Sequence, residues 1–360
     1  MDLLKVSTSP HIHEGESVKK VMWSVVIALI PALIAAYIFF GWRSLMLTGL
    51  GIISAVLTEA IIELLLKKPL TITDGSAVIT GMLLAFNLPP MTAWWIPVIG
   101  SAFAIAIGKQ VFGGLGYNPV NPALLGRAFL MASWPTQMTT GWTSKLAQMG
   151  VATLSGLKTS IVAGTGTAYQ EMITSATPLT TAKALRTEIL AGEAAQSAQP
   201  LFHNLSSPDT IHALFWGNIG GCIGEVCAAA LLIGAAFLAY KRYIGWRIPT
   251  AYIGTVALLA WIFGGVDGYF SGPILFHIFS GGLILGAFFM ATDMVTSPVT
   301  KKGRLIFGIG CGIITMIIRL WGGYPEGVSY SILLMNLTTP LLDKYTRSKP
   351  FGYRKRGKSE

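Results

Sequence analysis

The sequence predicts an all-helical protein embedded in a membrane, on three observations. Of its 360 residues, 52% are hydrophobic and 12% are charged, whereas about 25% of the residues of a soluble domain are charged. Several apolar runs approach the length of about 20 residues that a helix needs to cross a bilayer. Lys and Arg are also distributed unevenly among the connections, as they are in multi-pass membrane proteins.

Ten apolar segments bounded by glycine, proline or charge are expected to span the membrane. They are residues 20–40, 45–66, 75–90, 93–112, 120–135, 213–239, 248–265, 272–291, 304–321 and 327–342. The third, fifth and tenth segments are short. They are therefore expected to be half-spans or tilted helices that pack inside the bundle.

The positions of Lys and Arg predict the orientation. When the N-terminus is placed in the cytoplasm, most of the 26 Lys and Arg residues fall on the cytoplasmic side, as the positive-inside rule requires. Both chain ends are then cytoplasmic. The net charge of +10 is interpreted as a topology signal, and no nucleic-acid partner is expected. Residues 1–18 lack the short apolar core of a cleavable signal peptide.

This orientation divides the chain into five parts. They are a cytoplasmic segment (1–19), a first five-span membrane repeat (20–135), a periplasmic loop (136–212), a second five-span repeat (213–342) and a basic cytoplasmic tail (343–360). The loop is too long for a simple connection, and it shows few strong helix or strand patterns. Its apolar residues, such as Ile161 and Ile173, predict partial order against the membrane domain.

Similar glycine-containing strings in the two halves indicate an internal repeat. Gly81 corresponds to Gly286, and the pair Gly113–Gly114 corresponds to Gly322–Gly323. Five spans per half is an odd number, so the second copy is expected to be inverted, with irregular backbone near the middle of the bundle. The alternative is that these glycines only allow close packing of helices.

Carboxylates inside apolar segments are costly and often functional. Glu225 lies within the sixth segment, and Asp74 and Asp293 lie near the inner ends of the third and eighth. These three residues are candidates for an ion path. The structural alternative is that they cap helix ends.

The other polar residues of the membrane segments are assigned structural roles. Arg127 and Arg319 are expected to bind backbone carbonyls or a carboxylate, and Glu63 is expected to pair with Lys67 at the membrane surface. The three cysteines lie in apolar runs and are interpreted as small buried side chains. The five histidines show no metal-ligand spacing. No metal site and no catalytic residue are therefore assigned.

Several strings together make the chain resemble the RnfD/NqrB family. They are "STSPHI", "KQVFGGLGYNPVNPALLGR", "SATPLTT", "GAFFMATDMVTSPVTKKGRLIFG", "RLWGGYPEGV" and "LTTPLLDKYTRSKPFGYRK", and they extend over nearly the whole chain. Members are membrane subunits of the ion-translocating ferredoxin:NAD oxidoreductase (Rnf or Rsx) and of the sodium-pumping NADH:quinone oxidoreductase. The resemblance implies a fold similar to that of urea and ammonium channels.

The resemblance also implies a covalent flavin. Family members carry FMN, joined by a phosphoester to the last threonine of a short signature. Here the signature corresponds to Glu171, Thr174, Ser175, Ala176 and Thr177, with Glu171 and Ser175 in place of the usual Asp and Gly. Thr177 is then the acceptor.

The residues that follow the acceptor add two expectations. Pro178 cannot continue a helix from before the site, so Thr177 is expected in an extended or turn segment. Lys183 and Arg186 are candidates to pair with the phosphate, and the alternative is that they form a solvated loop face. Since a relative in the family holds an unlinked riboflavin, a second flavin is a further candidate cofactor, and nothing in the sequence fixes its position.

The resemblance implies a membrane subunit that passes electrons through FMN and couples ferredoxin/NAD redox chemistry to the movement of sodium or protons. The implied partners are a periplasmic FMN subunit, the iron–sulfur and NADH/ferredoxin-side subunits, a flavin transferase and membrane lipid, in the inner membrane of a bacterium. The chain itself has no nicotinamide or iron–sulfur motif. The alternative function is a transporter or channel for small solutes or ions that uses the repeat without a flavin.

Overall fold

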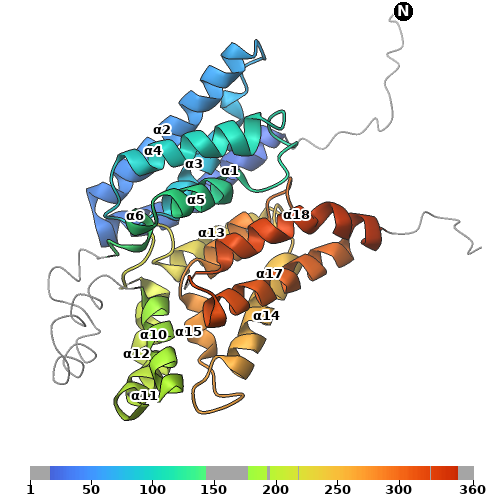
Figure 1. Ribbon diagram of the computed structural model, residues 1–360. Helices are drawn as coiled ribbons and strands as arrows, with labels where there is room; N and C mark the ends of the chain where they lie inside the picture. The colour runs from blue at the N-terminus through green and yellow to red at the C-terminus, as the bar shows by residue number, and fades with distance from the viewer. Residues whose placement is uncertain (1–16, 143–176, 193–194, 218, 325, 348–360) are drawn as a thin grey trace, which may run out of the picture.

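The computed structural model describes residues 17–142, 177–192, 195–217, 219–324 and 326–347. Within these ranges the fold is all-helical, with no β-strand (Figure 1). The signature residues Glu171, Thr174, Ser175 and Ala176 lie outside the described residues, as do most of the two predicted terminal segments.

The helices of the first half begin immediately after the N-terminal segment. They are α1 (Val18–Phe40), α2 (Trp42–Leu65), the 3-10 turn η1 (Ile72–Asp74), α3 (Ser76–Phe86), α4 (Trp95–Ile105), the π-helical η2 (Ala106–Gln110), α5 (Pro122–Ser133) and α6 (Pro135–Thr139).

The remaining helices follow Thr177. They are α10 (Pro178–Ala191), α11 (Ala195–His203), the 3-10 turn η3 (Asn204–Ser206), α12 (Pro208–Trp216), α13 (Ala228–Tyr240), α14 (Arg247–Phe263), α15 (Ile274–Phe279), α16 (Leu283–Leu285), the π-helical η4 (Gly286–Met290), α17 (Lys301–Trp321) and α18 (Val328–Thr346).

Three of these helices, α1, α2 and α17, are long and apolar enough to cross a membrane. The prediction that the chain is a multi-pass membrane protein is therefore confirmed. The other predicted spans coincide with shorter helices, so the number of ten spans stays a prediction.

Two of the ten predicted segments are not single helices. The sixth, 213–239, contains the end of α12, a non-helical stretch and α13, which begins only at Ala228. The eighth, 272–291, is divided into α15, α16 and η4, and Gly281 adopts a left-handed φ of 66° between the first two. Hydropathy reports where a segment is buried, but it does not report backbone conformation. The apolar runs therefore could not reveal these breaks.

The two halves pack in the same pattern. In the first half α2 contacts α3 and α4, and α4 contacts α5. In the second half α14 contacts α15 and α17, and α17 contacts α18. Across the halves, α1 packs against α13 and α5 packs against α18. The first and fifth helices of each half thus contact their own counterparts, which is the arrangement expected around a two-fold pseudo-axis.

The end of α3 inside the bundle is capped by the non-helical stretch that precedes α13. Gly224 N donates to Phe86 O at 2.9 Å, and Ile223 N donates to Leu88 O at 3.0 Å. The Cys222 thiol donates to Asn87 O at 3.3 Å. A helix end inside a membrane protein needs such partners because its last carbonyl groups have none within the helix.

Most of the predicted loop that the structure describes is folded into helices. The helices α10, α11 and α12 gather at one end of the molecule, opposite to the end at which α18 terminates (Figure 1). They enclose an apolar cluster that includes Leu179, Leu185, Phe202, Leu214 and, from α15, Phe276. The expectation of few helical patterns in this loop was therefore wrong for residues after Thr177. Ile161 and Ile173, the apolar residues from which partial order of the loop was predicted, lie outside the described residues.

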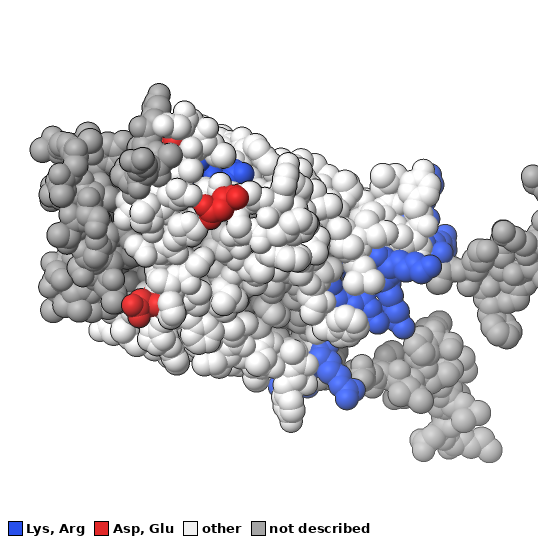
Figure 2. All heavy atoms as spheres, turned by 90° about the horizontal axis from the view of Figure 1, so that it is seen from below, with Lys and Arg blue, Asp and Glu red and all other residues white. Residues whose placement is uncertain are grey.

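Charge is distributed between the two ends of the molecule. On the face in Figure 2, Lys and Arg side chains gather at the end where α18 terminates, and the visible Asp and Glu side chains lie toward the other end. Lys67, Lys241 and Lys301, which adjoin ends of α2, α13 and α17, are exposed. The cytoplasmic position of that end stays a prediction of the positive-inside rule.

Candidate functional site

Thr177 occupies the N-cap position of α10. Its backbone is extended (φ −72°, ψ 156°), as expected from the following proline, and Pro178 takes the first helical position. Its hydroxyl oxygen accepts a hydrogen bond from Thr180 N at 3.3 Å and lies 2.8 Å from Thr180 Oγ1. The hydroxyl oxygen of Thr177 thus lies at the N-terminus of α10, the positive end of the helix dipole, where a negative charge is stabilised.

The position of Thr177 is fixed by the residues that follow it. Leu179 lies against Gly281, since a Cβ atom built on this glycine would be 2.6 Å from Leu179 Cδ1. Gly281 also has a left-handed φ of 66°, a backbone conformation that favours glycine. The start of α10 is therefore seated on the break between α15 and α16. Thr177 is buried there, with an exposed fraction of 4%.

Lys183 and Arg186 fasten α10 to the membrane helices. Lys183 Nζ donates to Gly322 O, at the end of α17. Arg186 donates to Leu320 O at 3.3 Å and to Phe263 O at 3.2 Å, near the ends of α17 and α14. Partial burial lowers the pKa of both groups. Cations at helix C-termini are favourable because the exposed carbonyl groups there carry partial negative charge.

These contacts differ from one of the two expectations for the cations, the solvated loop face. Neither residue forms a solvated loop face, and the hydrogen bonds that the structure gives them go to backbone carbonyls. Their predicted pairing with a phosphate on Thr177 stays a prediction.

A second group of polar residues lies where the two halves meet. Arg127 of α5 donates to Asn87 Oδ1 and to Ser329 Oγ, both at 2.7 Å, and forms an ion pair with Glu326. Glu225 lies close by, with its Oε1 atom 3.7 Å from Arg127 Nη1. We call Arg127, Glu225, Glu326 and Arg319 the central charge cluster.

Arg319 completes the cluster from α17. Its guanidinium group donates to His277 O at 2.6 Å and to Ser280 O at 3.1 Å, the carbonyls at the end of α15. Arg319 binds carbonyls and Arg127 binds a carboxylate, which confirms the roles expected for these residues. Sequence reasoning missed Glu326, because it lies in the short connection between α17 and α18 and not in an apolar run.

The three carboxylates considered for an ion path are not equivalent. Asp74 Oδ1 accepts hydrogen bonds from Ser76 N at 2.8 Å and Ser76 Oγ at 2.7 Å, at the start of α3. Asp293 accepts from Val295 N at 3.4 Å and Thr296 Oγ1 at 3.1 Å. Asp74 therefore has the capping geometry of the structural alternative, and Asp293 stabilises a turn. Glu225 has neither kind of partner.

A buried ion pair in the first half was also missed. Lys109 Nζ contacts Glu59 and donates to Ser76 Oγ at 2.6 Å, and Gln110 Nε2 donates to Glu59 Oε1 at 3.1 Å. Lys109, near the end of the predicted segment 93–112, is only 2% exposed. An unpaired glutamate in an apolar span is a signal that could have prompted the search for such a partner.

The expected pair between Glu63 and Lys67 is not formed. Glu63 is buried and accepts hydrogen bonds from the backbone and the hydroxyl of Thr71. The chain turns back after α2, so a backbone donor satisfies this carboxylate. Lys67 is exposed, with a positive φ of 52°.

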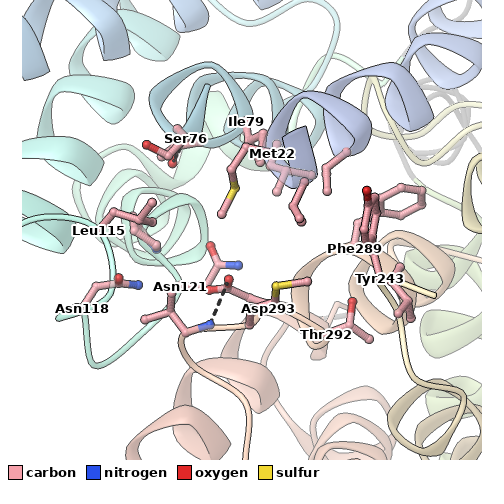
Figure 3. Close-up of a pocket in the computed structure, with 18 of the residues that line it drawn as sticks. Met22, Ser76, Ile79, Leu115, Asn118, Asn121, Tyr243, Phe289, Thr292 and Asp293 are labelled. Atoms are coloured by element: carbon pink, nitrogen blue, oxygen red, sulfur yellow. Dashed lines mark hydrogen bonds between the residues drawn. The ribbon is translucent and has the colours of Figure 1, made fainter. Parts of the chain in front are cut away.

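A cavity of about 100 Å³ opens between the two halves, near the end at which α18 terminates. Figure 3 shows Asn121 and Asp293 on one side of this space and Phe289 and Tyr243 on another. Lys109 also contributes to the lining. Its lining of aromatic surface and a few polar groups is typical of small-molecule sites, but the cavity is smaller than the roughly 300–1,000 Å³ that such sites usually have.

Comparison with known proteins gives consistent matches. The family described as "NQR2, RnfD, RnfE family" matches residues 5–352. The chain is 50% identical over 357 residues (98% of this chain, 96% of the relative) to a subunit of the "Na(+)-translocating ferredoxin:NAD(+) oxidoreductase complex" of Acetobacterium woodii. It is 46% identical over 355 residues (98% of each chain) to a subunit of the "Proton-translocating ferredoxin:NAD(+) oxidoreductase complex" of Clostridium ljungdahlii. It is also 36% identical over 366 residues (98% of this chain, 100% of the relative) to a subunit of the "Ion-translocating oxidoreductase complex" of Klebsiella pneumoniae.

Proposed function

The chain belongs to the NQR2, RnfD, RnfE family, and from this we propose that it is the membrane subunit of a redox-driven ion translocase that carries FMN on Thr177. In this role it passes electrons between partner subunits of an Rnf complex and couples ferredoxin/NAD chemistry to ion movement. The single observation that carries the proposal is the placement of Thr177 at the start of α10, against the membrane helices.

The surroundings of Thr177 suit a phosphoester. The N-terminus of α10 favours a negative charge, and the esterified oxygen keeps a lone pair for the hydrogen bond from Thr180 N. FMN would supply one- and two-electron transfer at this position. Because Thr177 is buried, we propose that the transferase acts before α10 is seated on the break between α15 and α16.

The predicted orientation places Thr177 on the periplasmic side, with both termini in the cytoplasm of a bacterial inner-membrane protein. Lys183 and Arg186 hold α10 at the C-terminal ends of α14 and α17. The predicted topology puts these helix ends outside the cell, and exposed lysines gather at the opposite end. The matched packing of the two halves also supports the two inverted repeats of five spans.

A second flavin, if one binds, has a candidate place in the cavity between the halves. Phe289 and Tyr243 would cover the face of a ring, and Asn121 would offer hydrogen bonds to its edge (Figure 3). We propose this cavity, which must widen beyond its present volume of about 100 Å³ to hold the whole molecule, as the site for an unlinked riboflavin. The Phe289→Ala variant is expected to lose the riboflavin and to retain the covalent flavin.

The covalent flavin is tested by fluorescence of the denatured chain. The protein is produced in a host with the flavin transferase and run on a denaturing gel under ultraviolet light. A fluorescent band is expected for the natural chain and for Thr177→Ser. Thr177→Asp, which retains a helix cap but has no hydroxyl, is expected to be dark. Thr181→Ala, one turn further along α10, is the matched control and should remain fluorescent.

Mass spectrometry of the tryptic peptide that contains Thr177 gives a second measurement. The expected mass increase is that of FMN joined with loss of water. An unmodified peptide from the native complex would contradict the proposal. A chain that is dark in a competent host but conducts a solute or ion in vesicles would instead support the transporter alternative.

A further inference from the structure

Glu225 is a carboxylate buried where the two halves meet. Its exposed fraction is 6%, and it lies in the non-helical stretch before α13. Neither of its oxygens accepts a hydrogen bond from a residue that the structure describes. Its carboxylate packs against Gly282, because a Cβ atom at that glycine would overlap Glu225 Oε1.

The groups that face Glu225 are committed to other partners. Arg127 is bonded to Asn87 and Ser329 and paired with Glu326. Arg319 donates to the carbonyls at the end of α15. The thiol of Cys222, within 4.8 Å of the Glu225 and Glu326 carboxylates, donates to Asn87 O.

The central charge cluster is neutral when Glu225 is ionised and carries one net positive charge when Glu225 is protonated. If Glu225 and Glu326 are both ionised, they neutralise Arg127 and Arg319. If Glu225 is protonated, Arg127 keeps its ion pair with Glu326, and Arg319 keeps its carbonyl partners. Both states therefore leave the two guanidinium groups with partners.

The protonated and the ionised form of Glu225 are stabilised in different ways. An ionised carboxylate without hydrogen-bond donors is costly in a buried site, and protonation removes that cost. The distance of 3.7 Å between Glu225 Oε1 and Arg127 Nη1 exceeds a hydrogen bond by less than 1 Å. A small rotation of the side chain would therefore form a charge-assisted hydrogen bond for the ionised state.

This cluster is connected to the start of α10. Leu179, two residues after Thr177, lies against Gly281, and the next residue, Gly282, lies against the Glu225 carboxylate. Charge that arrives close to Thr177 would act on Glu225 through a protein interior, where electrostatic interactions are screened less than in water. The other two candidate carboxylates, Asp74 and Asp293, already accept hydrogen bonds and lack this connection.

We propose that Glu225 is a proton-exchanging carboxyl group, which takes up one proton when negative charge arrives at Thr177 and returns it when that charge leaves. The carboxylate accepts one proton from the solvent and becomes a carboxylic acid; no electron passes through the residue. The protonation itself follows from the buried site alone, and its link to Thr177 rests on the proposed function.

Protonation of Glu225 is tested by infrared difference spectroscopy of the full chain in lipid while the pH is changed. The natural protein is expected to show the C=O band of a protonated carboxyl group that disappears as the pH rises. Glu225→Gln should lack this band, and Glu225→Asp should restore a titrating band. Asp293→Asn, which alters a carboxylate that has donors, is the control and should retain it.

Two results would overturn the proposal. One is a titrating band that persists unchanged in a Glu225→Gln protein whose elution profile and melting curve match the natural protein. The other is a band that responds to added sodium or zinc at constant pH and not to pH, which would indicate a cation site.

The link to Thr177 is tested by redox titration of the covalent flavin at several pH values. In the natural protein the midpoint potential is expected to fall with rising pH, and Glu225→Gln should reduce this slope. An unchanged slope would overturn the link. A gel without flavin fluorescence would instead refute the proposed function, while the infrared measurement would still decide whether Glu225 carries a proton.

Discussion

Two of the buried glutamates of the membrane region, Glu59 and Glu225, lie in different surroundings. Glu59, in the first half, is fully buried and has Lys109 and Gln110 as partners. Glu225, between the halves, is almost as buried but has no hydrogen-bond partner among the described residues. Glu59 has a lysine that is free to serve as its counter-ion, whereas Glu225 lies beside an arginine that is already paired with Glu326. The comparison therefore separates a structural carboxylate from a candidate functional one.

Removal of the charge of Glu59 should have the largest effect on stability. Glu59→Gln leaves Lys109 buried without its counter-ion, which is expected to cost about 3–5 kcal/mol. Thermal unfolding in detergent micelles measures this loss. The double variant Glu59→Gln with Lys109→Met is the control and should recover most of the stability. If it does not, the ion pair is not the cause.

A smaller loss is expected in the central charge cluster from Glu326→Gln. Arg127 would lose its ion pair but keep its hydrogen bonds to Asn87 and Ser329, so the expected cost is about 1–3 kcal/mol. The same unfolding experiment applies. An unchanged melting temperature would mean that Glu225 moves to replace Glu326, which the Glu225→Gln, Glu326→Gln double variant would reveal.

A still smaller loss of stability is expected when the N-cap of α10 is removed. Thr177→Ala removes the oxygen that accepts from Thr180 N, at a cost of about 1 kcal/mol. Thr177→Asp should preserve the cap and the stability. Unflavinylated protein from a host without the transferase is compared, so that the cofactor does not contribute. Equal losses in both variants would argue against the capping role.

The smallest change is expected for Glu225→Gln. Because Glu225 lacks hydrogen-bond donors and Arg127 is already paired with Glu326, a neutral side chain of similar shape should alter the stability by less than about 1 kcal/mol. A loss as large as that of Glu59→Gln would show that the two carboxylates are alike, and the comparison would fail.

Sequence reasoning located the helices better than it located their partners. Each of the ten apolar segments contains helix, since burial in a membrane requires both apolar side chains and internally bonded backbone. The breaks at residues 219–227 and 280–282 were not foreseen in position, because glycine permits a break without requiring one. The helices after Thr177 had visible signals, the Thr177–Pro178 start and Gly192 at the end of α10, which a closer inspection would have recognised.

The sequence by itself determined that this chain is a multi-pass helical membrane protein and which family it belongs to, and the resemblance to that family implied Thr177 as the candidate flavin site. These properties follow from composition, charge order and short contiguous motifs. Only the tertiary structure decided that Lys109 pairs with Glu59, that Arg127 pairs with Glu326, and that Glu225 is left without a donor. The partners lie 50 to 199 residues apart in the chain, and only the packing of the helices brings them together.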